Sequence, residues 1–230
     1  MKNLALYLTI NYPSRASFFE ILDVIEAFQI GYVEIGIPVT NPHVDGAVVR
    51  RTQEEVFPKL TTQEIESVLS EVRKRYSFKI ILMTYYEGVE YFNLNQLSQK
   101  LYDAVLCVDK ELNSERFSGL VHTFNCGMDQ KEVDRQLSQS SQFIYLVSGE
   151  GKTGEMAQLP NDYKEILPSI KSKTELPVFV GFGVKEPKDI TSILKSGADG
   201  AIIGSEFIKQ FNEAGFSGIK NYLTDIQTAY

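Results

Sequence analysis

Short apolar runs alternate along this chain with longer stretches in which apolar residues recur every three or four positions. The short runs predict eight buried strands, at residues 4–10, 32–37, 78–84, 104–108, 120–124, 143–147, 178–181 and 200–203. The periodic stretches predict helices at residues 17–29, 62–75, 94–100, 131–137, 163–171, 187–195, 206–212 and 218–228. Residues 113–117, after the fourth strand, carry only a weak helical pattern.

Strands that alternate with helices are typical of parallel β/α proteins. Eight such units close naturally into a (β/α)₈ TIM barrel, and a length of 230 residues suits that fold. An open doubly wound sheet is the competing fold, but it often has a glycine-rich first turn, and residues 11–14 contain no glycine. We therefore expect a single barrel domain over residues 1–230, with long functional loops at 37–46 and 148–160.

A glutamate interrupts the second apolar strand. Burial of an unpaired ionised carboxylate costs several kcal/mol, so Glu34 needs a partner, a proton or a chemical role. Asp45 follows eleven residues later, on a loop beside Gly46. Two carboxylates in different environments can divide acid and base roles, with desolvated Glu34 favouring its protonated form and Asp45 ionising more easily. A structural glutamate bonded to backbone amides is an equally open alternative.

Glycines gather after the last three strands, at 151 and 154, at 181 and 183, and at 204 beside Ser205. Glycine lets backbone N–H groups approach a ligand closely, and the final loops of a barrel often hold phosphate. Ser205 could instead serve only as a helix N-cap. Tyr7, Tyr85, Tyr145 and Phe182 also fall at strand ends, where they could form a slot for an aromatic ring or simply pack the core.

The composition narrows the class of protein. A net charge of −7 argues against a general nucleic-acid binder, and the chain has no apolar run of about 18 residues that would span a membrane. Its N-terminal residues do not have the layout of a signal peptide. Two histidines argue against a His-based metal site, and two cysteines fit a reducing compartment. We therefore expect a cytoplasmic protein that uses no metal.

The two acids and the glycine clusters described above, in their order along the chain, resemble the α-subunit family of tryptophan synthase. The resemblance runs from Leu6 onward, and its matching stretches are 34–38 with 42 and 45–46, 82–86, 145–148 with 151 and 153–154, 177–183, and 197–201 with 204–205. It implies a lyase that cleaves indole-3-glycerol phosphate by a retro-aldol reaction into indole and glyceraldehyde 3-phosphate. It also implies no metal or organic cofactor, and a tryptophan synthase β subunit as a possible partner.

The resemblance assigns roles to individual residues. Asp45 would take or polarise the indole N–H proton, while Glu34 would protonate the ring carbon at the side-chain junction and then take the proton of a substrate hydroxyl. The residues that would bind the rest of the substrate are Tyr7, Val49, Met83, Tyr85, Leu106, Tyr145, Thr153 and Phe182. The phosphate would be held by Gly154, Gly183, Gly204 and Ser205.

The chain also departs from the family pattern. It shows no helix before the first strand and no proline after Asp109, and unusual residues stand at Tyr12, Asn41, Glu87 and Gly149. Several of these positions face the β subunit in the family. Because both proposed acids remain, we hypothesise that the chemistry survives while coupling to a standard β subunit is altered or lost. The alternatives are a catalytically weak homologue that acts as a regulatory or binding subunit, and a related barrel for another indole or sugar phosphate.

Overall fold

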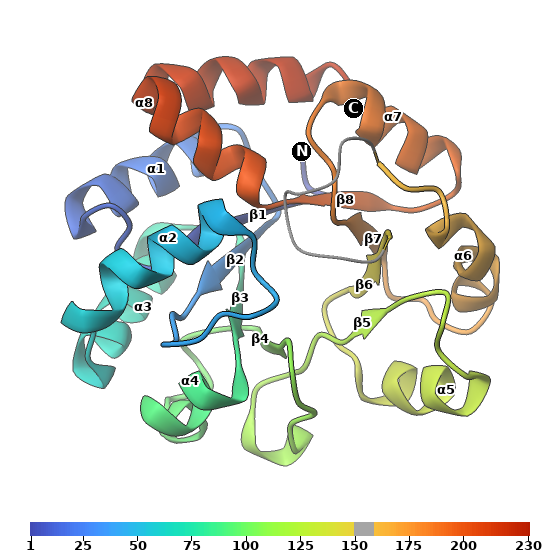
Figure 1. The fold of residues 1–230 in the computed structure, drawn as a ribbon, viewed down its shortest axis with the longest axis horizontal. Coiled ribbons are helices and arrows are strands. Elements are labelled where there is room, and N and C mark those ends of the chain that lie inside the picture. The colour runs from blue at the N-terminus through green and yellow to red at the C-terminus, as the bar shows by residue number, and fades with distance from the viewer. Residues whose placement is uncertain (150–158) are drawn as a thin grey trace.

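In the computed structural model, which describes residues 1–149 and 159–230, eight parallel strands form one curled sheet in the order β4-β3-β2-β1-β8-β7-β6-β5. Helices surround the strands (Figure 1). The strands are β1 (Leu4–Thr9), β2 (Tyr32–Gly36), β3 (Lys79–Thr84), β4 (Ala104–Cys107), β5 (Thr123–Phe124), β6 (Ile144–Val147), β7 (Val178–Gly181) and β8 (Gly200–Ile203). The helices are α1 (Arg15–Ala27), α2 (Ala47–Val56), α3 (Thr62–Arg75), α4 (Tyr86–Tyr91), α5 (Gln130–Gln139), α6 (Tyr163–Lys171), α7 (Pro187–Lys195) and α8 (Ser205–Gln227).

The two ends of the sheet meet just before β5. Val105 of β4 and Leu120 form an isolated parallel bridge. The Val105 N–H donates to Gly119 O at 2.9 Å, and the Val121 N–H donates to Val105 O at the same distance. The ring of strands therefore closes, which confirms the predicted TIM barrel. That residues 1–230 make up one domain stays a prediction.

The strands begin and end close to where the apolar runs predicted them, except that β5 is shortened to two residues. One predicted helix is wrong: residues 94–100 form only a short 3₁₀ turn at Leu94–Gln96, preceded by Asn93 with a left-handed φ of 50°. The helix of this unit lies earlier, at α4. The two predicted C-terminal helices are joined as α8 across a non-helical residue, Gly215.

Helix α2 was not predicted, and it carries residues of the site. It starts at Gly46, which offers no side-chain cap, so the usual sequence signal of a helix start is missing. Its buried positions do follow the helical spacing, but two of the four are polar, Thr52 and Gln53 beside Val49 and Val56. Because half of these buried positions are polar, the sequence does not show the apolar periodicity that predicts the buried face of a helix.

Large rings fill part of the barrel interior. Phe143 and Phe179 stack with ring centroids 4.9 Å apart, and Tyr32 meets both edge-on. Because side chains alternate along a strand, the next inward positions toward the strand ends are Glu34 after Tyr32 and Tyr145 after Phe143. The rings thus close the barrel below the level at which Glu34 and Tyr145 project inward, and leave the end formed by the loops after the strands for a pocket.

Candidate active site

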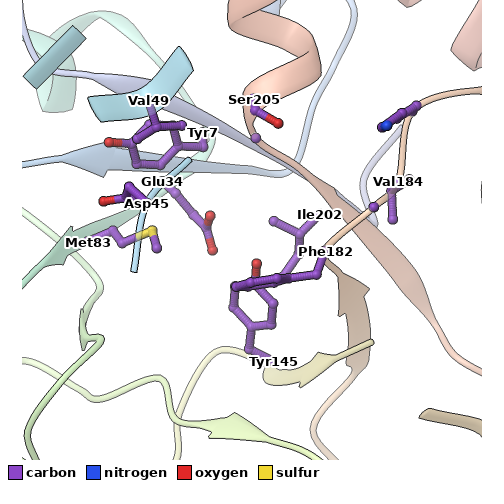
Figure 2. A pocket seen from close by; sticks show the side chains of 13 residues that line it. Tyr7, Glu34, Asp45, Val49, Met83, Tyr145, Phe182, Val184, Ile202 and Ser205 are labelled. Carbon is purple, nitrogen blue, oxygen red and sulfur yellow. The ribbon is translucent and has the colours of Figure 1, made fainter. Parts of the chain in front are cut away.

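Glu34 projects from β2 into a pocket at the carboxyl ends of the strands. It pairs in register with Tyr7 of β1 and is 1% exposed. Figure 2 shows its carboxyl directed into the pocket, with Asp45 and Met83 nearby and Tyr145 across the cavity. Its Oε1 atom is buried without a hydrogen-bond partner among the described residues. Desolvation raises the pKa of Glu34 to about 8, so the carboxyl holds a proton at neutral pH.

Asp45 lies on the loop between β2 and α2 and is buried as well, with 5% exposure. Burial raises the pKa of Asp45 above its ordinary value, and hydrogen bonds from Tyr85 and Gln53 and the charge of Arg50 oppose that rise without cancelling it. The Tyr85 hydroxyl donates to Asp45 Oδ2 at 2.9 Å, and Gln53 Nε2 donates to the same atom at 2.8 Å. Asp45 is therefore a buried carboxylate that hydrogen-bond donors favour in its ionised form, in contrast to Glu34.

Tyr7 and Tyr145 border the pocket, and glycines make room for their rings. A Cβ atom at Gly36 would overlap the Tyr7 hydroxyl, and one at Gly181 would lie 2.6 Å from the Tyr145 ring. Burial raises the pKa of both tyrosines, and the charges of Glu34 and Asp45 raise it further. Both phenols therefore stay neutral near the two acids. The other apolar residues of the lining are Val49, Met83, Phe182, Val184 and Ile202.

The turn after β7 brings a strained aromatic residue to the pocket. Phe182 has a left-handed φ of 71°, and Gly183 follows with φ of 82°. The fully buried Ser148 hydroxyl bonds the carbonyl oxygens of Gly181 and Phe182, at 2.9 and 2.5 Å. Positive φ is costly for a side chain as bulky as Phe and persists where the surroundings enforce it. Ser148 thus fixes the turn that presents the Phe182 ring.

Backbone amides and one cation line the edge of the pocket formed after β7 and β8. Gly204 caps α8 without a side-chain hydrogen bond, and Ser205 begins that helix. Helix N-termini and glycine-rich turns favour anions because their N–H groups point toward the ligand. Gly183, Gly204 and Ser205 all line the pocket, and Lys185 lines it as well. This edge of the pocket is suited to an anionic group such as phosphate.

The structure brings together many of the residues that the sequence singled out. The predicted residues that line this one pocket are Tyr7, Glu34, Asp45, Val49, Met83, Tyr145, Phe182, Gly183, Gly204 and Ser205. Tyr85 is not among the lining residues, but its hydroxyl donates to Asp45, which is. Leu106 packs in the inner core of the barrel. Thr153 and Gly154 lie outside the described residues.

Other residues of the pocket were not predicted. Ile202 could have been found from strand alternation, because it lies two positions before Gly204. Val184 and Lys185 directly follow the Gly181–Gly183 turn, and this closeness in sequence to a predicted site residue could have indicated that they line the pocket. Gln53 carried no signal, since the helix that places it against Asp45 was itself not predicted.

The described residues contain no group of three or more His, Cys, Asp or Glu side chains arranged to hold a metal ion. Nor does any helix in the described part of the chain have the length and apolar character needed to cross a membrane. Within residues 1–149 and 159–230, the pocket lining supplies two carboxyl groups, hydroxyl groups, backbone amides and an ammonium group.

Fold and pocket define a class: a TIM barrel with a pocket at the carboxyl ends of its strands, in which two buried carboxyl groups lie near an amide-lined edge that suits an anion. The chain belongs to the tryptophan synthase alpha chain family, whose model matches residues 1–229. The tryptophan synthase alpha chain of Chloroflexus aurantiacus is 28% identical to it over 242 aligned positions, covering 97% of this chain and 91% of that protein.

Two solved structures from Pyrococcus furiosus have the same fold. One is the tryptophan synthase A-subunit, at 24% identity and a TM-score of 0.85, with 99% of this chain and 98% of that one covered. The other is a chain of a tryptophan synthase complex, at 24% identity and a TM-score of 0.83, with 98% of each chain covered.

Proposed function

We propose that this chain cleaves indole-3-glycerol phosphate to indole and glyceraldehyde 3-phosphate. The observation that carries the proposal is Glu34: a buried carboxyl group aimed into an aromatic-lined pocket, whose Oε1 atom has no hydrogen-bond partner among the described residues. A structural glutamate bonded to backbone amides, the alternative that the sequence left open, would have its oxygens satisfied. Membership of the tryptophan synthase alpha chain family supports the same reaction.

The reaction begins with the proton on Glu34. Because the pKa of Glu34 is raised to about 8, the carboxyl can give its proton to the indole ring carbon that bears the glycerol side chain. Asp45, ionised, accepts or polarises the indole N–H as electrons move from nitrogen into the ring. The product of this step is an indole tautomer whose ring carbon is tetrahedral and ready to lose the side chain.

The carbon–carbon bond breaks in the second step. Glu34, now a carboxylate, takes the proton of the adjacent side-chain hydroxyl, and that carbon becomes the aldehyde of glyceraldehyde 3-phosphate. The electron pair of the broken bond returns to the ring, and Asp45 returns any proton that it took from nitrogen. Both carboxyl groups end in their starting states, so the cycle consumes no cofactor or external proton.

The remaining lining residues would bind and orient the substrate. The apolar walls suit the indole ring, with Tyr7 and Tyr145 held neutral beside the two acids. The amides of Gly183, Gly204 and Ser205 suit the phosphate, which lies at the other end of the substrate. Fixing both ends would hold the scissile bond near Glu34, and such positioning is a large part of catalysis.

Indole release tests the proposal. The purified chain is mixed with indole-3-glycerol phosphate and compared with Glu34→Gln and with Glu66→Gln, a matched change at an exposed position on α3. Loss of a general acid–base should lower the rate about 10²- to 10⁴-fold in Glu34→Gln and leave Glu66→Gln unchanged. Equal rates in all three proteins would remove Glu34 from the mechanism. No indole from the wild-type chain, alone or with a β subunit, would favour a binding or regulatory role.

We further propose that a tryptophan synthase β subunit is the partner, with altered coupling. Glu87, one of the departures from the family pattern, is engaged within the chain: its Oε1 accepts the Thr40 N–H at 3.0 Å and the Thr40 hydroxyl at 2.6 Å. A side chain on α4 that is already bound to Thr40, on the loop after β2, has less to offer a partner. Size-exclusion chromatography with a family β subunit tests this, and tight assembly with strong mutual activation would contradict it.

We propose that the reaction takes place in the cytoplasm. This proposal is supported by Cys107 and Cys126, which are both free thiols, as is usual for proteins of a reducing compartment.

A further inference from the structure

Gln53 is a buried polar side chain whose role the reaction above leaves unexplained. It lies on the inward face of α2 and is 3% exposed. Its amide nitrogen donates to Asp45 Oδ2 at 2.8 Å, and its amide oxygen accepts the Val39 N–H at 3.1 Å. Both ends of the amide are therefore used, one on the carboxylate and one on the backbone of the loop that carries it.

Tyr85 makes a second link of the same kind. Its hydroxyl accepts the Val44 N–H at 3.1 Å and donates to Asp45 Oδ2 at 2.9 Å. The loop between β2 and α2 is thus held near its start at Val39 and near its end at Val44, and both links converge on a single carboxylate oxygen. The other oxygen, Oδ1, accepts neither of these two bonds, and it is the oxygen that would accept a substrate N–H.

We propose that Gln53 is a positioning residue: its amide ties the Asp45 carboxylate to the loop backbone at Val39, so that Asp45 faces the substrate in one fixed orientation. The inference rests on the proposed function, because it assumes that Asp45 meets the indole N–H. Gln53 itself does not line the pocket. It acts through Asp45, and its burial leaves little room for water to replace either bond.

Gln53 also favours the ionised state of Asp45. Several groups bear on that carboxylate, and each must be held constant in a test: Arg50 on α2, His43 on the loop, Tyr85 after β3, and Tyr7 and Tyr145 from β1 and β6. Arg50 and His43 lower the pKa of Asp45 by their charge, and the Gln53 hydrogen bond lowers it as well. Removing the Gln53 donor should therefore raise the pKa of Asp45.

Two substitutions separate the functions of the amide. Gln53→Glu keeps an oxygen to accept the Val39 N–H but puts a second carboxyl against Asp45, whereas Gln53→Leu removes both bonds. Gln63→Glu is the matched control, because it adds the same charge at an exposed position on α3. The ¹³C titration of the Asp45 side-chain carboxyl, assigned with Asp45→Asn, reports directly on the carboxylate in the full chain.

Gln53→Glu should raise the titration midpoint of Asp45 by about one pH unit or more, as expected for two carboxyl groups that share a site. Gln53→Leu should raise it as well, and should lower kcat/KM for indole release about 10²-fold at neutral pH, as a misplaced catalytic group does. In both variants the acidic limb of the kcat/KM profile should move to higher pH by the same amount as the titration midpoint. Gln63→Glu should change neither quantity.

An unchanged Asp45 midpoint in folded Gln53→Glu and Gln53→Leu would overturn the proposal. Loss of folding in both variants, with Gln63→Glu intact, would also overturn it, because it would assign Gln53 to the stability of the barrel. The titration needs no substrate. If the wild-type chain releases no indole, the proposed reaction fails while the titration still decides whether Gln53 controls Asp45.

Discussion

Replacing Glu34 by glutamine should make the protein gain stability relative to wild type as pH rises from 4.5 to neutral, although it removes a catalytic group. Burial raises the pKa of Glu34 from 4.5 to about 8. Between these two values the folded chain keeps a proton that the unfolded chain releases. The free energy of unfolding therefore falls as pH rises from 4.5 to 8, and outside that range this group causes no further change with pH.

The size of the effect follows from the pKa difference. At pH 7 the unfolded chain gains about 3 kcal/mol by ionising Glu34, at 1.36 kcal/mol per pKa unit above 4.5, while the folded chain gains almost nothing. Glutamine cannot ionise. The difference in unfolding free energy between Glu34→Gln and wild type should therefore move by about 3 kcal/mol in favour of the variant between pH 4.5 and pH 7.

Urea denaturation followed by circular dichroism, at pH values from 4.5 to 7, measures this difference. Any constant cost of placing an amide in the pocket is the same at each pH, so only the change with pH is diagnostic. Glu66→Gln, at its exposed position on α3, should follow the wild-type pH dependence. A difference for Glu34→Gln that stays constant within about 0.5 kcal/mol would refute the claim that Glu34 is held protonated by burial.

Three further results are expected. The kcat/KM for indole release should fall as pH rises above about 8, because the first step needs protonated Glu34, and a pH–rate profile measures this limb. Asp45→Asn should lower the rate of indole release about 10²- to 10⁴-fold with little change in the far-UV circular dichroism spectrum, since the amide cannot accept the indole proton. Gly181→Ala should raise KM and lower the unfolding free energy by about 1–3 kcal/mol, because the new Cβ would lie 2.6 Å from the Tyr145 ring; kinetics and urea denaturation test both effects.

Much of the fold and of the central chemistry could be predicted from the sequence because it depends on local patterns. Strand alternation determines which side of β2 Glu34 occupies, and a carboxylate among apolar residues marks a position that needs an explanation. In the same way, glycines after β7 and β8 marked two turns that the structure brings to one edge of the pocket. In each case a few adjacent residues carry the whole signal.

What could not be predicted depends on contacts between distant segments. Gln53 and Tyr85 reach Asp45 from positions 8 and 40 residues away, and nothing near either residue indicates that contact. Tyr85 was expected to bind substrate, but it contacts Asp45 instead of lining the pocket. The burial of Asp45 has the same origin: a loop position suggests an easily ionised carboxylate, whereas burial in the folded chain raises its pKa.

The most direct test of the account is a crystal structure of the chain with an indole phosphate that lacks the side-chain hydroxyl groups and so cannot be cleaved. We expect the indole nitrogen about 3 Å from an Asp45 carboxylate oxygen, the ring between Tyr7 and Tyr145, and the phosphate against Gly183 and the start of α8. An analogue bound elsewhere, or bound in this pocket with its ring out of reach of the Glu34 carboxyl, would contradict the account.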